Sequence, residues 1–267
     1  QRVGGQSELS PRDVLLKLGQ AEEAYAQPSF GALAPANLEV SRPALAPRML
    51  DACQAVLERL VFARVAAGKI DMPRSIAVVS VTAGEGTTTL ATHLAAAMTE
   101  FIHPAGDSNL VDRVLLVDAN VASPGAHKVL DTSAAPGVAE WLTEPSMNGR
   151  PLGDFVKPTT VPNLDLLPAG LASAGHQIGR WTDAVTLATT SSYHSIIIDL
   201  PSMDRSEASA RMAGLCDAAI LVVECNTANR EVVRQAAQRL EECGVMLLGT
   251  VLNKRTFPIP EQLYKWF

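Results

Sequence analysis

The residues best placed to do chemistry are those from Ser80 to Thr89, which separate an expected strand from an expected helix. Gly84 and Gly86 allow a tight turn with inward-pointing backbone N–H groups, and the start of the helix adds partial positive charge. This combination is typical of a phosphate-binding loop. The predicted cofactor-binding residues here are Gly84, Glu85, Gly86, Thr87, Thr88 and Thr89.

The loop departs from the usual pattern at one position. Phosphate loops of this class close on Gly-Lys-Ser/Thr, whereas Thr87 stands at the lysine position here. Thr88 keeps the hydroxyl that would sit on Mg²⁺. The missing lysine removes a fixed positive charge near the β and γ phosphates but leaves the backbone cradle. We therefore expect weakened binding of ATP or ADP with Mg²⁺ and doubtful phosphoryl transfer. An ordinary glycine-rich turn is the alternative interpretation.

Two aspartates end apolar runs further along the chain. Asp118 closes the run 111–118, and Asp199 closes the run 195–199. A carboxylate at the end of a buried strand is a common ligand of Mg²⁺ or of a water bound to it. Together with the hydroxyl of Thr88, these two carboxylates form the predicted metal set. For Asp118, a residue that only caps the next turn is the alternative.

Strand-sized apolar runs alternate with helical patterns across the chain. The expected strands are 75–81, 111–118, 164–167, 195–199, 218–224 and 245–252, and the expected helices are 49–67, 87–101, 137–142, 182–192, 206–215 and 229–243. Strands that are apolar throughout indicate burial on both faces. We predict an α/β fold with a doubly wound, mostly parallel sheet and helices on both faces. Ligands of such folds bind at the carboxyl ends of the strands, where all these motifs fall.

Residues 1–47 differ in composition from the rest. Ser10, Pro11 and Asp13 make a good helix start, and apolar residues could form one face up to about Tyr25. Prolines then recur through residues 27–47, which is typical of a linker or an extended arm. We predict an N-terminal helix and Pro-rich linker over 1–47 and a P-loop NTPase-like domain over 48–267.

Composition restricts the classes of function. The net charge of −6 argues against broad nucleic-acid binding, which needs a basic surface. The cysteines have no metal-ligand spacing and are expected to be buried free thiols of a cytosolic protein. The longest apolar runs are strand-sized, well short of the ~20 residues of a membrane span, so no direct membrane span is expected.

Three segments carry a resemblance to a known family. They are Ser80–Thr89, the run Leu115-Leu-Val-Asp-Ala-Asn-Val-Ala-Ser-Pro124 and the run Ile196-Ile-Ile-Asp-Leu-Pro-Ser202. In this order, from about residue 50 to the end, the chain resembles the bacterial tyrosine autokinases of capsule and exopolysaccharide synthesis. These are deviant-Walker relatives of the partitioning and division-site ATPases. The stretch Leu248–Asn253 also looks like the family, and the resemblance implies that Asn253 lies beside the adenine.

The departures from that family remove elements of phosphate transfer. Thr87 replaces the loop lysine, and Asn120 replaces an aspartate that the resemblance makes the base on the acceptor tyrosine. An amide cannot accept that proton. We therefore name no catalytic residue, since Thr87 and Asn120 only occupy the family's catalytic Lys and Asp positions. Ala122 replaces the arginine of the same motif, and Tyr264, which is expected to pack, stands alone where the kinases have a tyrosine cluster.

The resemblance also bears on assembly. Family members form rings through a helix with E-x-x-R-x-x-R, and the matching positions here are Asp51, Gln54 and Leu57. That contact is therefore largely lost, and a homo-oligomer is left open. Family members that stand alone work through a membrane-bound partner. The resemblance thus implies a polysaccharide chain-length or export protein that recruits this chain to the inner membrane, through the N-terminal helix or the helix 49–67.

These inferences favour a cytoplasmic regulatory or scaffold subunit of a bacterial exopolysaccharide or capsule synthesis and export system. It would be a degenerate relative of the tyrosine autokinases, a pseudokinase with ATP and Mg²⁺ binding left open. One alternative is an active tyrosine kinase or weak ATPase, which phosphate on Tyr264 would favour. A second is a partition or positioning ATPase. That family has an additional lysine early in its loop, which residues 80–84 lack.

Overall fold

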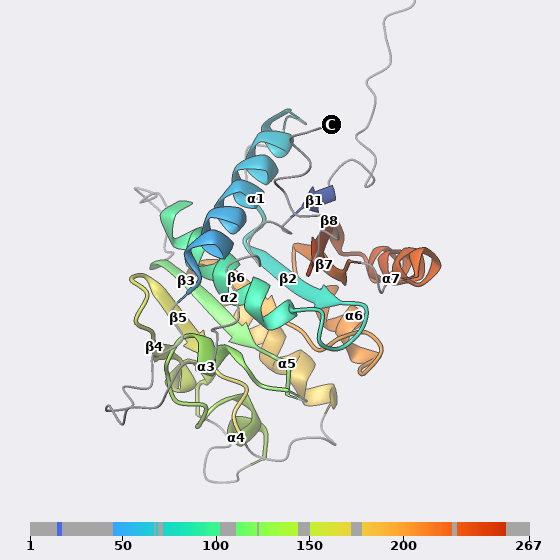
Figure 1. Cartoon of the computed structure of the whole chain (residues 1–267). Helices are drawn as coiled ribbons and strands as arrows, with labels where there is room; N and C mark the ends of the chain where they lie inside the picture. Colours follow the sequence, from blue (N-terminus) through green and yellow to red (C-terminus); the bar gives the residue numbers. More distant parts are fainter. Residues whose placement is uncertain are drawn as a thin grey trace, which may run out of the picture.

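The computed structural model describes residues 15–17, 45–66, 68, 72–101, 111–121, 123–143, 150–171, 178–225 and 229–254. Over these residues the strands form one sheet in the order β1-β8-β7-β2-β6-β3-β5-β4 (Figure 1). The strands are β1 (Leu15–Lys17), β2 (Ser75–Ser80), β3 (Val111–Asp118), β4 (Lys157–Pro158), β5 (Leu164–Leu167), β6 (Tyr193–Asp199), β7 (Ala218–Glu224) and β8 (Met246–Asn253). Only the β4–β5 pair is antiparallel among the described strands.

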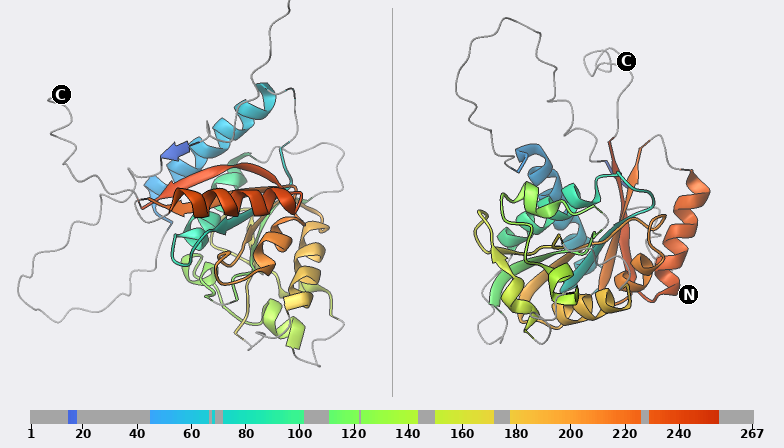
Figure 2. Two further views of the ribbon diagram at one scale, coloured as in Figure 1. Left: turned by 90° about the vertical axis from the view of Figure 1, so that its right-hand side faces the viewer. Right: turned by 90° about the horizontal axis from the view of Figure 1, so that it is seen from below.

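Helices cover both faces of this sheet (Figure 1, Figure 2). They are α1 (Pro47–Ala66), α2 (Thr87–Met98), α3 (Ala126–Val129), α4 (Val138–Thr143), α5 (Ile178–Thr189), α6 (Ala208–Ala213) and α7 (Arg230–Glu242), with short 3₁₀ turns η1 (Thr99–Phe101) and η2 (Leu152–Phe155). On the face of α1 and α2, the buried cluster includes Ile76 and Val78 of β2. The cluster on the face of α5, α6 and α7 takes the alternate residues Ala77 and Val79. Because successive side chains of a strand point to opposite faces, a sheet covered twice needs apolar residues at every position.

The predicted α/β architecture is confirmed. Strands β3, β5 and β7 have the expected bounds, and the other expected strands and helices shift by a few residues at their ends. The elements α3, η2 and β4 were not expected, since each is too short to produce a periodic pattern.

The predicted N-terminal helix is wrong where the structure describes it. Leu15–Lys17 form β1, which pairs in parallel with β8, Leu15 opposite Thr250. The unpaired N–H and C=O groups of an edge strand offer hydrogen bonds that a short helix start cannot match. The rest of the predicted helix and most of the linker lie outside the described residues, so the domain boundary at residues 47 and 48 stays a prediction.

None of the helices in the described part of the chain has the length and hydropathy needed to cross a membrane.

Candidate functional site

Three neighbouring strands of the sheet end at the same edge and carry the residues of interest. Strand β6 lies between β2 and β3. Its last residue, Asp199, is in register with Val78 of β2 and with Asp118 of β3. The loop after β2 therefore begins close to both aspartates, as the parallel sheet predicts.

The predicted phosphate loop leaves β2 at Ser80 and enters α2 at Thr87. Gly84 and Gly86 have φ angles of 86° and 90°, a left-handed backbone that glycine adopts without strain. Gly86 is the N-cap of α2, and its carbonyl accepts the hydrogen bond of the Leu90 N–H at 2.9 Å. The loop thus leads directly into the N-terminus of a buried helix, the position at which anions are stabilised.

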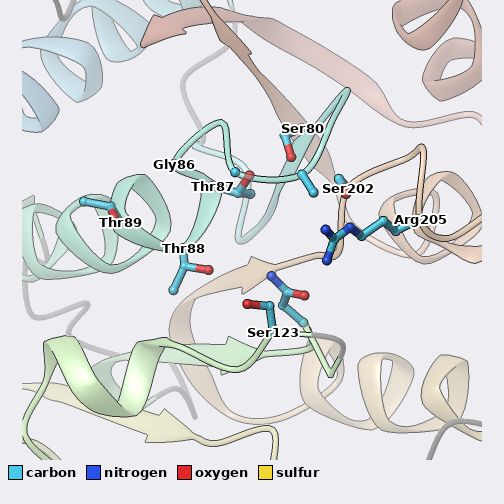
Figure 3. A pocket seen from close by; sticks show the side chains of 11 residues that line it. Ser80, Gly86, Thr87, Thr88, Thr89, Ser123, Ser202 and Arg205 are labelled. Carbon is cyan, nitrogen blue, oxygen red and sulfur yellow. The ribbon is translucent and has the colours of Figure 1, made fainter. Parts of the chain in front are cut away.

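A cavity of about 350 Å³ lies over this loop (Figure 3), a volume within the range of roughly 300–1,000 Å³ typical of small-molecule sites. Its lining comes from the loop with the start of α2, the turn after β3 and the turn after β6. The lining residues are Ser80, Ala83, Gly84, Gly86, Thr87, Thr88, Thr89, Asn120, Ser123, Ser202 and Arg205. Hydroxyls, backbone groups and one guanidinium thus surround a space suited to a polar, anionic ligand.

Glu85 belongs to the loop but does not line the cavity. Its side chain is 1% exposed, and its carboxylate accepts backbone N–H bonds from Val81 at 2.9 Å, Thr82 at 3.0 Å and Glu224 at 3.2 Å. Asn253 Nδ2 donates to the carbonyl of Glu85 at 2.9 Å. These two residues brace the loop against β7 and β8. The role of Asn253 beside an adenine stays a prediction.

Asp118 is buried at the end of β3 and holds the turn that follows. Its Oδ1 accepts the Asn120 N–H, and its Oδ2 accepts those of Gly125 and Ala126, all at 3.1 Å. Burial raises the pKa of Asp118 to about 6, although these N–H groups act in the opposite direction. Asp118 therefore caps the turn and places Asn120 at the cavity, while its role as a metal ligand stays a prediction.

Asp199 differs from Asp118 because no described residue gives either of its oxygens a hydrogen bond. Burial, and next the charge of Asp118, raise the pKa of Asp199 well above its ordinary value. The nearby Thr88 hydroxyl acts in the opposite direction on this pKa, although neither Asp199 oxygen has a partner at full hydrogen-bond geometry among the described residues. A buried carboxylate without a partner is costly in an empty site. A Mg²⁺ ion or a water bound to it would satisfy such oxygens, so the predicted set of Thr88, Asp118 and Asp199 fits the ion.

The structure brings most of the predicted site residues together. Gly84, Gly86, Thr87, Thr88, Thr89 and Asn120 line the cavity, whereas the side chains of Glu85 and Asn253 lie behind the loop. Sequence reasoning missed Ser123, Ser202 and Arg205, which lie in irregular turns. The only signal for them was their position shortly after the strand-end aspartates. Ala122 and Tyr264 lie outside the described residues.

The sheet order, the loop and the helix that follows it define a P-loop NTPase-like protein. The family model described as "Cellulose biosynthesis protein BcsQ" matches residues 73–254. The "Tyrosine-protein kinase CpsD" of Streptococcus pneumoniae serotype 4 (strain ATCC BAA-334 / TIGR4) is 30% identical over 190 residues, which cover 69% of this chain and 77% of the relative.

Solved structures show the same fold. The kinase domain of the Escherichia coli tyrosine kinase ETK aligns with a TM-score of 0.63 and 20% identity, covering 79% of this chain and 78% of that one. The second is the septum site-determining protein MinD complexed with Mg-ADP, from Pyrococcus horikoshii OT3. It aligns with a TM-score of 0.55 and 23% identity, covering 73% of this chain and 77% of that one.

The chain belongs to the BcsQ family, and its homologues include tyrosine-protein kinases. The resemblance inferred from the three motifs is thereby confirmed.

Proposed function

We propose that this chain is a cytoplasmic regulatory subunit of a bacterial exopolysaccharide synthesis and export system, which binds a nucleotide with Mg²⁺ and does not phosphorylate tyrosine. The chain belongs to a family whose description names cellulose biosynthesis, which supports a role in polysaccharide synthesis. The homology to tyrosine-protein kinases supports an ancestral nucleotide site.

The observation that carries the nucleotide proposal is the pair of unpartnered oxygens of Asp199, which lies near Thr88 of the cavity lined by the phosphate loop. In this proposal the backbone N–H groups of the loop and the N-terminus of α2 hold the phosphates. The Thr88 hydroxyl, Asp199 and Asp118 hold Mg²⁺, directly or through water. Bound Mg²⁺ neutralises phosphate charge, and Asp118 also fixes the turn that carries Asn120.

The absence of transfer is proposed from two side chains at the same cavity. Thr87 supplies a hydroxyl where the resemblance calls for a lysine, and the amide of Asn120 cannot take a proton from a tyrosine. An active kinase is the second candidate, because the relative at 30% identity is named a tyrosine-protein kinase. A positioning-type ATPase is the third candidate function, because the chain shares its fold with MinD.

A membrane-bound chain-length or export protein is the proposed partner, with α1 as the contact. Phe62 and Val65, near the end of this helix, are 78% and 58% exposed, and large apolar side chains in water favour an interface. Leu57 occupies the last arginine position of the family's ring-forming helix. Its side chain is fully buried in the core, so it is not available for contact with another copy of the chain.

The test is a calorimetric titration of the purified chain with MgATP, repeated with Asp199→Asn. We expect saturable binding that Asp199→Asn weakens about 10- to 100-fold, the loss of one charged interaction. Asp112→Asn is the matched control, since Asp112 is exposed at the other end of β3. A folded chain that gives no heat at millimolar ATP would contradict nucleotide binding.

A further inference from the structure

The phosphate loop of this chain lacks a fixed positive charge of its own. Between Ser80 and Thr89 the only charged side chain is Glu85, whose carboxylate is bound to backbone N–H groups on the far side of the loop. The strand-end carboxyls Asp118 and Asp199 are buried side by side in register on β3 and β6. A polyphosphate placed here would meet negative charge unless a cation from outside the loop balanced it.

Arg205 is the only charged residue among those that line the cavity. Figure 3 shows its guanidinium extending into the space between Thr87 and Ser123. Within the described residues this guanidinium forms no hydrogen bond or ion pair, although Asp204 and Glu207 are close in sequence. Its five donors are therefore available to a ligand in the cavity.

The backbone around Arg205 is tied to the strand that starts the phosphate loop. The Met203 N–H donates to the Ser80 carbonyl at 2.9 Å, and the Asp204 N–H donates to the Val81 carbonyl at 3.1 Å. The Arg205 N–H closes the turn on the Ser202 carbonyl at 3.1 Å. These bonds fix the backbone of Arg205 relative to the loop, and its exposed side chain reaches the cavity from there.

We propose that Arg205 takes the place of the missing loop lysine and binds the phosphate chain of the nucleotide. A guanidinium binds phosphate oxygens through two parallel hydrogen bonds, which suits it to this role. The proposal rests on the proposed function, because it concerns the same cavity and the same ligand. It goes beyond the proposed function because it assigns the cationic group that binds phosphate to Arg205, in the turn after β6.

The test compares MgATP affinities of the wild type, Arg205→Ala and Arg211→Ala by calorimetry. Arg211 is exposed on α6 and does not line the cavity, so its substitution changes the net charge equally without touching the ligand. We expect Arg205→Ala to weaken binding about 10- to 100-fold, the loss of a charged hydrogen-bonded contact. Arg211→Ala should change it by no more than about twofold.

A third variant tests the substitution of one cation by the other. Thr87→Lys in the Arg205→Ala background should restore most of the lost affinity, because the lysine returns to the loop position. Thermal unfolding of each variant confirms that it is folded. Equal affinities of Arg205→Ala and Arg211→Ala would overturn this inference and leave the proposed function standing. A loss that Thr87→Lys does not restore would also overturn it. A wild type that binds no MgATP would refute the proposed function, and this inference with it.

Discussion

Replacing Asp199 by asparagine should stabilise the ligand-free chain, although it removes a predicted metal ligand. The Asp199 carboxyl is buried beside Asp118, and no described residue donates a hydrogen bond to it. The asparagine side chain would keep the shape of the aspartate and lose its charge. Because Asp199→Asn breaks no hydrogen bond among the described residues, the main effect is relief from burying a charge.

The size of the effect can be bounded from the neighbouring carboxyl. Burial raises the pKa of Asp118 to about 6, and a rise of about two pH units costs about 3 kcal/mol at neutral pH. The pKa of Asp199 is also raised, by burial and by Asp118. The buried side-chain amide of the Asp199→Asn variant also lacks a hydrogen-bond partner, and this lowers the stabilisation by about 1–3 kcal/mol. We expect a net stabilisation of up to about 2 kcal/mol, which raises the Tm by up to about 8 °C.

The pH dependence gives an independent check. A carboxyl whose pKa is raised on folding binds a proton more tightly in the folded state. Its contribution to stability is therefore present at low pH and is lost as the pH rises through the folded-state pKa. The advantage of Asp199→Asn over the wild type should be small near pH 5 and should grow toward pH 8.

The assay is thermal unfolding of both proteins from pH 5 to pH 8, with chelator and without nucleotide. Asp112→Asn, an exposed position on β3, controls for the change in net charge and should leave the Tm within about 2 °C. A lower Tm for Asp199→Asn, or a difference that does not vary with pH, would refute the reasoning.

Three further predictions concern the groups that hold the loop. Glu85→Gln places an amide against three backbone N–H donors. It should lower the free energy of unfolding in urea by about 2–4 kcal/mol. An unchanged urea midpoint would show that these bonds do not brace the loop. Gly86→Ala should destabilise because φ is 90° and the new Cβ overlaps the Asn253 amide; adding Asn253→Ala should recover about 1 kcal/mol, whereas strict additivity would contradict the overlap. His93 accepts the hydrogen bond of the Ala46 N–H at Nε2, at 3.0 Å, and burial lowers the pKa of His93. The contribution of neutral His93 to folding stability is therefore present above about pH 6.5 and is lost as the pH falls. In thermal unfolding from pH 7 to pH 5, His93→Gln should therefore lose less Tm than the wild type, and parallel curves would exclude His93 as the cause.

Much of the fold could be predicted because its strands are long and apolar on both faces. β3 and β7 were located to the residue, since their aliphatic runs 114–117 and 218–223, each followed by an acidic residue, have few other interpretations. The phosphate loop was found from its glycines, whose positive φ angles the structure confirms. The strand at Leu15–Lys17 could not be predicted, because its pairing with β8 is a long-range contact that local capping signals do not report.

The site was predicted less completely than the fold. Which side of the loop Glu85 faces depends on the backbone N–H groups of β7, far away in sequence. Arg205 lies in an irregular turn, and the main-chain bonds of its neighbours Met203 and Asp204 to Ser80 and Val81 hold that turn beside the cavity. Side chains in such turns have no periodic pattern, so their direction follows only from the tertiary structure.

The central claim is that this chain binds a nucleotide but does not transfer its phosphate to tyrosine. The most direct test incubates the purified chain with γ-labelled ATP and Mg²⁺ at a concentration that saturates the calorimetric titration. An authentic tyrosine autokinase run in parallel serves as the positive control. We predict bound nucleotide with no label on tyrosine. Label on a tyrosine of this chain, lost in Asp199→Asn, would contradict the account and identify an active kinase.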